Sequence, residues 1–163
     1  MKVLTLYYSK SGHTKKVAEI IREAVGGDIG LIRTKKNYAR SYVGAVIQGG
    51  LQRLTGTMPE LLPLPFDLSG YDVVFLGGPV WWFTIAPALQ RFLMEADLSG
   101  KRVYPFLTSG GQPKDAFQDL EAACGDAHVG EGFHVYFKGN QMMAGPEEIQ
   151  TWAEGSAAEG VEE

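Results

Sequence analysis

Short apolar segments alternate with amphipathic segments along nearly the whole chain, and this alternation strongly limits the folds open to it. We predict strands over residues 3–8, 28–34, 73–76, 103–107 and 129–137. Apolar residues at helical spacing predict helices over 14–25, 85–96 and 113–124, and a final helix that starts at Pro146. Strands joined by helices form a parallel sheet with helices on both faces. The expected fold is therefore α/β: a three-layer, doubly wound sandwich around a five-stranded parallel sheet.

Two features depart from this simple pattern. Apolar residues at helical spacing lie within 37–56, but glycines at 44, 49 and 50 oppose a helix by about 1 kcal/mol each. We expect the segment 38–58 to be an interface, a lid or the plain second helix of the sheet. Pro105 stands in the middle of the fourth strand, where it removes a hydrogen bond of the sheet.

The length and composition favour a single domain. The chain has 163 residues, of which 45% are hydrophobic, and this suits one compact unit. We expect the domain to comprise residues 1–155 and the acidic end, 156–163, to fray. A formal net charge of −4 without a basic stripe argues against binding to nucleic acid.

The single cysteine, Cys124, allows no disulfide within the chain and indicates a reducing compartment. Its place among apolar residues of a helix predicts a buried, unreactive thiol. We find no signal peptide and no apolar run of the roughly 18 residues that cross a bilayer, so we expect a cytoplasmic protein without membrane contact. The three histidines and the cysteine lack metal-ligand spacing, and no metal is expected.

The loop after the first strand has the composition of a phosphate site. It has the sequence Tyr8-Ser9-Lys10-Ser11-Gly12-His13-Thr14 and leads into an amphipathic helix. Free backbone N–H groups and the positive end of the helix dipole attract an anion there, and the hydroxyls can add hydrogen bonds. The loop matches neither the dinucleotide fingerprint nor the ATP-binding P-loop. An ordinary capped helix start is the alternative.

The loop expected over 77–84 contains three successive aromatic residues, Trp81, Trp82 and Phe83. A loop at the edge of a sheet cannot bury all three in the core. A planar aromatic ligand would stack on them, and each stacked pair contributes about 0.5–1.5 kcal/mol beyond the area it buries. The alternative is a hydrophobic plug, in which Trp81 or Trp82 packs under the segment 38–58.

The third unusual loop is Thr108-Ser109-Gly110-Gly111-Gln112. Its hydroxyls and backbone amides suit the edge of a ring with carbonyl and nitrogen acceptors, although a need for positive φ would also explain the glycines. All three loops follow strands of a parallel sheet, where ligands bind in such folds. A phosphate, a flat ring and a polar ring edge together describe a mononucleotide with a large base, and flavin mononucleotide (FMN) fits best.

The chain resembles the flavodoxins and flavodoxin-like flavoproteins over nearly its whole length. The first loop matches the family pattern S/T-x-S/T-G-x-T, and the other matching parts are residues 71–82, Pro87 with Phe92-Leu93, and 98–103 leading to 108–111. The resemblance implies the strand order 2-1-3-4-5 and non-covalently bound FMN. It implies that FMN is held by Ser9, Ser11, Gly12, His13, Thr14, Gly78, Pro79, Val80, Trp81, Trp82, Phe83, Thr108, Ser109, Gly110 and Gly111.

The resemblance also implies a division of roles. Residues 9–14 would hold the phosphate, residues 79–83 would lie along one side of the isoalloxazine, and residues 108–111 would line its other side or its pyrimidine edge. No residue stands out as a general acid or base, so we name no catalytic side chain.

Two departures from the electron-carrying flavodoxins bear on function. Many of those proteins have a tyrosine in the third loop that covers the outer flavin face, where this chain has glycines and a serine. Many also have a glycine in the second loop that stabilises the one-electron-reduced flavin, and Trp82 lies near that place. We therefore expect an oxidoreductase that passes electrons from reduced nicotinamide, NAD(P)H, through FMN to a quinone or a similar acceptor. The alternative is a flavodoxin proper, a one-electron carrier between protein partners. The sequence leaves the oligomeric state open.

Overall fold

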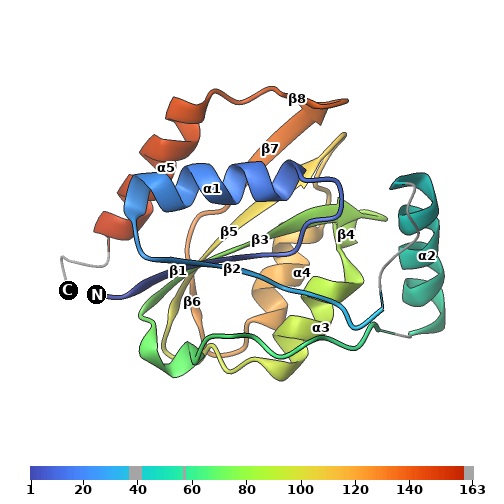
Figure 1. The fold of residues 1–163 in the computed structure, drawn as a ribbon, viewed down its shortest axis with the longest axis horizontal. Coiled ribbons are helices and arrows are strands. Elements are labelled where there is room, and N and C mark those ends of the chain that lie inside the picture. Colours follow the sequence, from blue (N-terminus) through green and yellow to red (C-terminus); the bar gives the residue numbers. More distant parts are fainter. Residues whose placement is uncertain (37–41, 57, 160–163) are drawn as a thin grey trace.

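A computed structural model of the chain describes residues 1–36, 42–56 and 58–159. A sheet lies between two layers of helices (Figure 1). Its strands have the order β2-β1-β3-β5-β7-β8, with β6 pairing with β5 and β4 with β3. They are β1 (Val3–Tyr7), β2 (Asp28–Leu31), β3 (Val73–Trp81), β4 (Thr84–Ile85), β5 (Arg102–Ser109), β6 (His128–Val129), β7 (Phe133–Lys138) and β8 (Gln141–Met142).

The parallel part of this sheet confirms the predicted fold class and strand order. β6 and β7 both pair in parallel with β5 and together fill the fifth position. β4 and β8 are short antiparallel additions to β3 and β7. The expected strand order 2-1-3-4-5 is thus present, with its last strand in two pieces.

Helices cover both faces of the sheet and form two hydrophobic cores. α1 (His13–Val25) and α5 (Pro146–Ala158) pack on one face, whereas α3 (Pro87–Glu95) and α4 (Ala116–Ala123) pack on the other (Figure 1). A short 3-10 helix, η1 (Leu68–Gly70), precedes β3. No helix of the described residues is long and apolar enough to cross a membrane.

The segment 38–58, for which the sequence left three roles open, contains a helix, α2 (Tyr42–Thr55), in an unusual place; residues 38–41 and 57 lie outside the described residues. The helix stands at one end of the molecule, beside the β3–β4 hairpin, instead of lying flat on the sheet (Figure 1). The face of the sheet near β2 is covered by the proline-containing segment 58–68, whose Phe66 ring would clash with a Cβ on Gly30 at 2.5 Å. Because this segment takes the place on the sheet, α2 is free to pack elsewhere.

Pro105 is accommodated by a break in the neighbouring strand. The N–H of Arg102 donates to the carbonyl of Asp72 on the β3 side, and alternate residues of a parallel strand donate to opposite neighbours. The backbone nitrogen of Pro105, which has no hydrogen, therefore faces the side of β6 and β7. On that side residues 130–132 connect β6 to β7 and are not strand partners of β5. Gly132 lies in that gap, and a Cβ on it would be only 3.1 Å from Cγ of Pro105.

Several predicted boundaries are wrong. The expected loop over 77–84 is mostly strand, because β3 continues to Trp81 and turns into β4. The second strand ends at Leu31, and α4 begins at Ala116 instead of Pro113. α5 continues to Ala158 with Ser156 buried, so residues 156–158 of the expected tail are helical, while 160–163 lie outside the described residues.

Glycines inside β3 are required by packing, which gives a test of the core. A Cβ on Gly77 would lie 2.1 Å from the ring of Phe106. We expect Gly77→Ala to lower the free energy of unfolding by about 1–3 kcal/mol, because the ring has to move in a filled core. Urea denaturation measures this change.

Gly155→Ala is the matched control. Gly155 lies in α5 with no atom within 4 Å of an added Cβ, and alanine in a helix is favoured over glycine by up to about 1 kcal/mol. We expect this variant to be as stable as the parent or more so. Equal stability of the two alanine variants would contradict the close approach of β3 to Phe106.

Candidate cofactor site

Direct contacts join the three loops that the sequence singled out. The hydroxyls of Thr14 and Thr108 are 2.8 Å apart and buried, which links the first loop to the third. The backbone N–H of Tyr8 donates to the carbonyl of Gly77 at 3.0 Å, which links the first loop to β3. Pro79 pairs with Thr108 in the β3–β5 ladder. The loops at the carboxyl ends of β1, β3 and β5 therefore lie together at one edge of the sheet.

The first loop is arranged around the hydroxyl of Ser9. This oxygen accepts hydrogen bonds from the backbone N–H groups of Gly12 at 3.2 Å and Lys15 at 3.3 Å. Gly12 precedes α1 with φ 91°, a left-handed conformation that favours glycine. Amide groups thus converge at the start of the helix, where an anion would be stabilised.

The charges around the first loop also favour an anion. The first turn of α1 contains no acidic residue, although acidic residues are the favourable choice near a helix N-terminus. Lys15 and Lys16 stand there instead, and Lys10 precedes them in the loop. In contrast, the first turn of α5 carries the acidic pair Glu147 and Glu148. Lys15 and Lys16 are repelled by the positive end of the helix dipole, and an anion bound at the start of α1 would offset this repulsion.

The side chain of His13 points to a different partner than predicted. Its ring stacks on Phe137 with a centroid distance of 4.2 Å, and its Nε2 is 3.1 Å from Oδ1 of Asn140. The imidazole therefore holds the β7–β8 turn against the start of α1. The backbone of His13 remains at the helix N-terminus, in the place expected of a phosphate ligand.

The second loop is a tight hairpin that separates its three aromatic residues. Trp81 is the predicted hydrophobic plug, because its side chain is only 2% exposed. Its ring contacts Tyr8 edge-on. It also packs against α2, where a Cβ added to Gly49 would lie 2.8 Å from the ring. Trp82 and Phe83 are 44% and 63% exposed. Of the three aromatic rings, only those of Trp82 and Phe83 are exposed enough for a ligand to stack on them. Gly78 is buried within β3 against Leu89, and Pro79 and Val80 are half-buried.

The turn itself has an unfavourable backbone conformation. Trp82 and Phe83 have φ values of 55° and 64°, and they connect the paired residues Trp81 and Thr84. Two central residues with positive φ define a type I′ hairpin turn, which normally contains Asn-Gly. Large side chains in this conformation cost on the order of 1 kcal/mol or more each. The hydroxyl of Thr84 donates to the carboxylate of Asp119 in α4, which anchors the hairpin.

The third loop begins with a polar pair. The hydroxyl of Ser109 is 2.7 Å from Nε2 of His134 on β7 and 2.8 Å from the carbonyl oxygen of Gly111. Burial lowers the pKa of the His134 imidazole below its usual range, so the neutral ring is favoured. The pair fixes the start of the loop without placing a charge there.

Gly110 and Gly111 have no role that the fold requires. Neither has positive φ, so the alternative explanation, that the loop needs glycines for positive φ, is wrong. A Cβ on Gly111 would meet no atom within 4 Å, and one on Gly110 would meet only a carbonyl oxygen at 3.7 Å. Both residues are exposed. The fold would accept side chains here, and their absence leaves the loop open to close approach.

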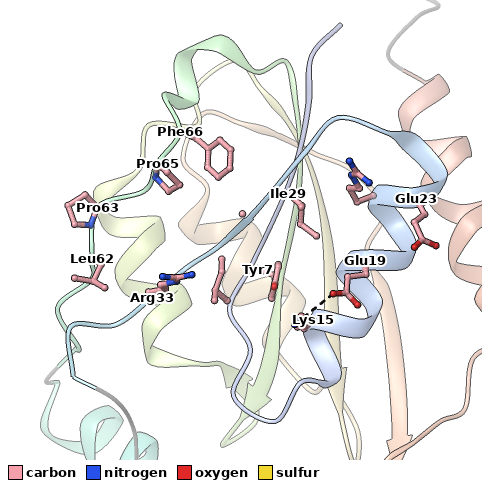
Figure 2. Close-up of a pocket in the computed structure, with 13 residues that line it drawn as sticks. Tyr7, Lys15, Glu19, Glu23, Ile29, Arg33, Leu62, Pro63, Pro65 and Phe66 are labelled. Atoms are coloured by element: carbon pink, nitrogen blue, oxygen red, sulfur yellow. Dashed lines mark ion pairs between the residues drawn. The ribbon is translucent and has the colours of Figure 1, made fainter.

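Hollows near the site lie on the side of β2. One of about 370 Å³ borders Ser9 and Lys10 of the first loop and is closed by residues 31–34 and Leu62. A larger groove of about 760 Å³ runs along β2 and α1 (Figure 2). Tyr7, Arg33 and the ion pair between Lys15 and Glu19 line this groove, which includes no residue of the second or third loop. We therefore do not assign it to the cofactor.

Sequence reasoning missed the contribution of the β7–β8 region. His134, Phe137 and Asn140 each contact one of the predicted loops, but they stand far from those loops in the chain. The alternation that includes His134 and Phe137 in the predicted last strand indicated only an apolar face near a sheet edge, and Asn140 lies beyond that strand. The pairing of β7 with β5 is what brings them to the site.

The geometry defines a class of protein: a doubly wound α/β protein with an anion-favouring loop, exposed aromatic rings and an open glycine loop at the carboxyl end of its sheet. Comparison with known proteins gives the family. The flavodoxin family model matches residues 2–155, and the chain belongs to the flavodoxin family.

Solved structures are similar to this chain over most of its length. Candidate flavoproteins from Bacteroides uniformis and Bacteroides eggerthii are 26% and 27% identical to it, each with a TM-score of 0.79. The matches cover 93% and 96% of this chain and 96% and 98% of those proteins. A flavoprotein from Lactobacillus acidophilus, solved in complex with FMN, shares the fold with 24% identity and a TM-score of 0.72, over 82% of this chain and 92% of that one.

The backbone of the hairpin turn can be tested at Phe83. We expect Phe83→Gly to be more stable than Phe83→Ala by about 1 kcal/mol, because both variants lack the ring and only glycine relieves the positive φ. The two unfolding free energies are compared by urea denaturation.

Met94 supplies the control, since it is exposed in α3. At this position Met94→Ala should be more stable than Met94→Gly by about 1 kcal/mol, because glycine is unfavourable in a helix. The same order at both positions would rule out a left-handed conformation at Phe83.

Proposed function

We propose that this protein binds FMN non-covalently at the carboxyl end of its sheet and acts as an oxidoreductase. The observation that carries the cofactor proposal is Gly111, because the fold requires no glycine there and its loop is joined to the first loop by the Thr14–Thr108 hydroxyl pair. The FMN complex of the Lactobacillus acidophilus flavoprotein, which has the same fold, supports the choice of ligand.

The residues of the site suit the parts of FMN. The amides and lysines at the start of α1 would hold the phosphate. Trp82 and Phe83 offer exposed rings for stacking with the isoalloxazine, and the third loop offers backbone groups to a ring edge. Bound FMN supplies the redox chemistry, while the protein supplies position and electrostatics.

The proposed reaction passes electrons from NAD(P)H to a quinone or a similar acceptor. Its support is the third loop, which has no aromatic residue in 108–112 and has open space at Gly111. A second planar molecule has room to approach a flavin bound there. The single cysteine allows no disulfide within the chain, and this supports a reducing compartment and hence a cytoplasmic location.

A one-electron carrier that serves protein partners is the second candidate. Membership of the flavodoxin family and the size of the chain favour it. The described residues form one α/β unit.

Gly111→Leu separates ligand binding from stability. We expect the apo variant to unfold within about 0.5 kcal/mol of the parent, because Gly111 is exposed and a Cβ added there meets no atom within 4 Å. Its affinity for FMN should fall at least about tenfold, which corresponds to 1.4 kcal/mol, since the side chain would occupy the space of the ring edge. Quenching of FMN fluorescence gives the affinity, with Met94→Ala as an exposed control.

Unchanged FMN affinity in Gly111→Leu would remove the third loop from the site. A parent protein that neither quenches FMN fluorescence nor gains thermal stability from FMN would contradict the cofactor proposal as a whole.

Anaerobic mixing with NADH or NADPH tests the reaction. For an oxidoreductase we expect either nucleotide to bleach the flavin absorbance of the holoprotein within seconds and a quinone to restore it. If neither nucleotide bleaches the flavin, and a one-electron-reduced form accumulates during photoreduction, the protein is a carrier instead. This experiment uses the holoprotein, so it tests the reaction separately once FMN binding has been measured.

A further inference from the structure

Helix α2 has its large apolar residues on the outside. Val43, Ile47, Leu51 and Leu54 are 67%, 53%, 58% and 86% exposed, and their spacing places them on one face of the helix. The inner side is made of small residues such as Ala45, which is buried. A helix that only covered its own domain would have the opposite arrangement.

This apolar face continues into the candidate cofactor site. Gly50 is seven residues from Val43 and so lies on the same face. A Cβ on Gly50 would be 2.4 Å from the ring of Trp82, which shows that the half-exposed indole rests on the helix. Val43, Ile47, Leu51, Leu54 and Trp82 therefore form one apolar surface, which we call the α2 patch.

The position of the α2 patch leaves it accessible. α2 stands at the outer end of the molecule, away from α1, α4 and α5 (Figure 1). Its exposed face is therefore open to contact with an equivalent helix of another molecule.

The chemistry of the α2 patch fits a copy of itself. An isologous contact requires a surface that is self-complementary, and an uncharged apolar stripe meets this condition. Arg53 is the single charged residue in the sequence of α2. Helices that lie on lipid surfaces are instead rich in lysine and arginine on their polar face, so a membrane is the poorer partner.

The available area is sufficient for a reversible dimer. Burial of an aliphatic side chain removes about 60–120 Å² from water, and half of an indole adds about 100 Å². Each copy thus offers on the order of 400 Å² of apolar surface. Two copies together would bury about 800 Å² of apolar surface. Since homodimer interfaces are about 65% apolar, the whole interface would bury about 1,200 Å², which is the lower limit for a specific interface.

We propose that the α2 patch is a dimer interface between two copies of this chain. The two helices pack antiparallel across a two-fold axis, which also aligns their dipoles favourably. Ile47 of one copy then faces Leu51 of the second, and Val43 faces the other end of the second helix. The second copy covers Trp82 and so closes one side of the cofactor site, which leaves Phe83 as the exposed ring for stacking with the isoalloxazine.

Sedimentation velocity of the full-length apo chain, from about 1 to 200 µM, tests this proposal. The parent is expected to shift reversibly from monomer to dimer, and Ile47→Glu to remain monomeric, because the interface would bury an unpaired charge. Met94→Glu, on the exposed side of α3, should dimerise like the parent. A parent that is monomeric at every concentration, with or without binding to anionic vesicles, overturns the proposal. Equal loss of dimer in Ile47→Glu and Met94→Glu also overturns it.

Paired cysteines test the antiparallel register. Cys124 is buried with a raised pKa, so the native thiol adds little background. Under mild oxidation, Ile47→Cys with Leu51→Cys should give covalent dimers, whereas Val43→Cys with Ile47→Cys should not, because no two of its cysteines face each other. The reverse result rejects this interface. Both experiments use the protein without FMN, so their failure is distinguishable from failure of the proposed function.

Discussion

The burial of Trp81 under α2 determines how the carboxyl end of the sheet is built. Its ring lies so close to Gly49 that the inner face of α2 has to consist of small residues. Such a face buries little apolar surface, and the large side chains of α2 are left on the outside. The same ring contacts Tyr8, which leads into the first loop. One buried side chain thus connects the second helix, the hairpin and the anion-favouring loop.

Polar contacts within the site hold its loops in place before any ligand arrives. The Thr14–Thr108 hydroxyl pair is buried, and His134 fixes Ser109 from a neighbouring strand. A hydrogen bond between buried groups in a low dielectric is costly to break, because each group would lose its partner without gaining water. Loops fixed in this way have less freedom to lose on binding, so more of the contact energy contributes to affinity.

The sequence predicted the parts of the molecule that depend on local pattern. The parallel sheet follows from apolar strands and intervening helices, and the juxtaposition of the three loops at one edge of the sheet follows from their places after strands. What it missed depends on contacts between distant residues. The continuation of β3 through residues 77–81 needs β5 beside it, the imidazole of His13 needs Asn140, and Pro105 needs the gap between β6 and β7. The placement of α2 could not be predicted from local sequence, because its glycines are unfavourable in a helix. Gly49 and Gly50 are required only because the rings of Trp81 and Trp82 pack against them.

The distribution of apolar surface bears on the choice between a carrier and an oxidoreductase. A carrier needs an accessible flavin edge and a docking surface whose charges match those of its partner, because such complexes form by electrostatic steering. Here the surface beside Trp82 is apolar and, if it pairs with a second copy, is not available for docking. Access is then confined to the side of the third loop, where Gly111 leaves open space. An opening of this kind suits a small planar substrate better than a protein, which favours the oxidoreductase.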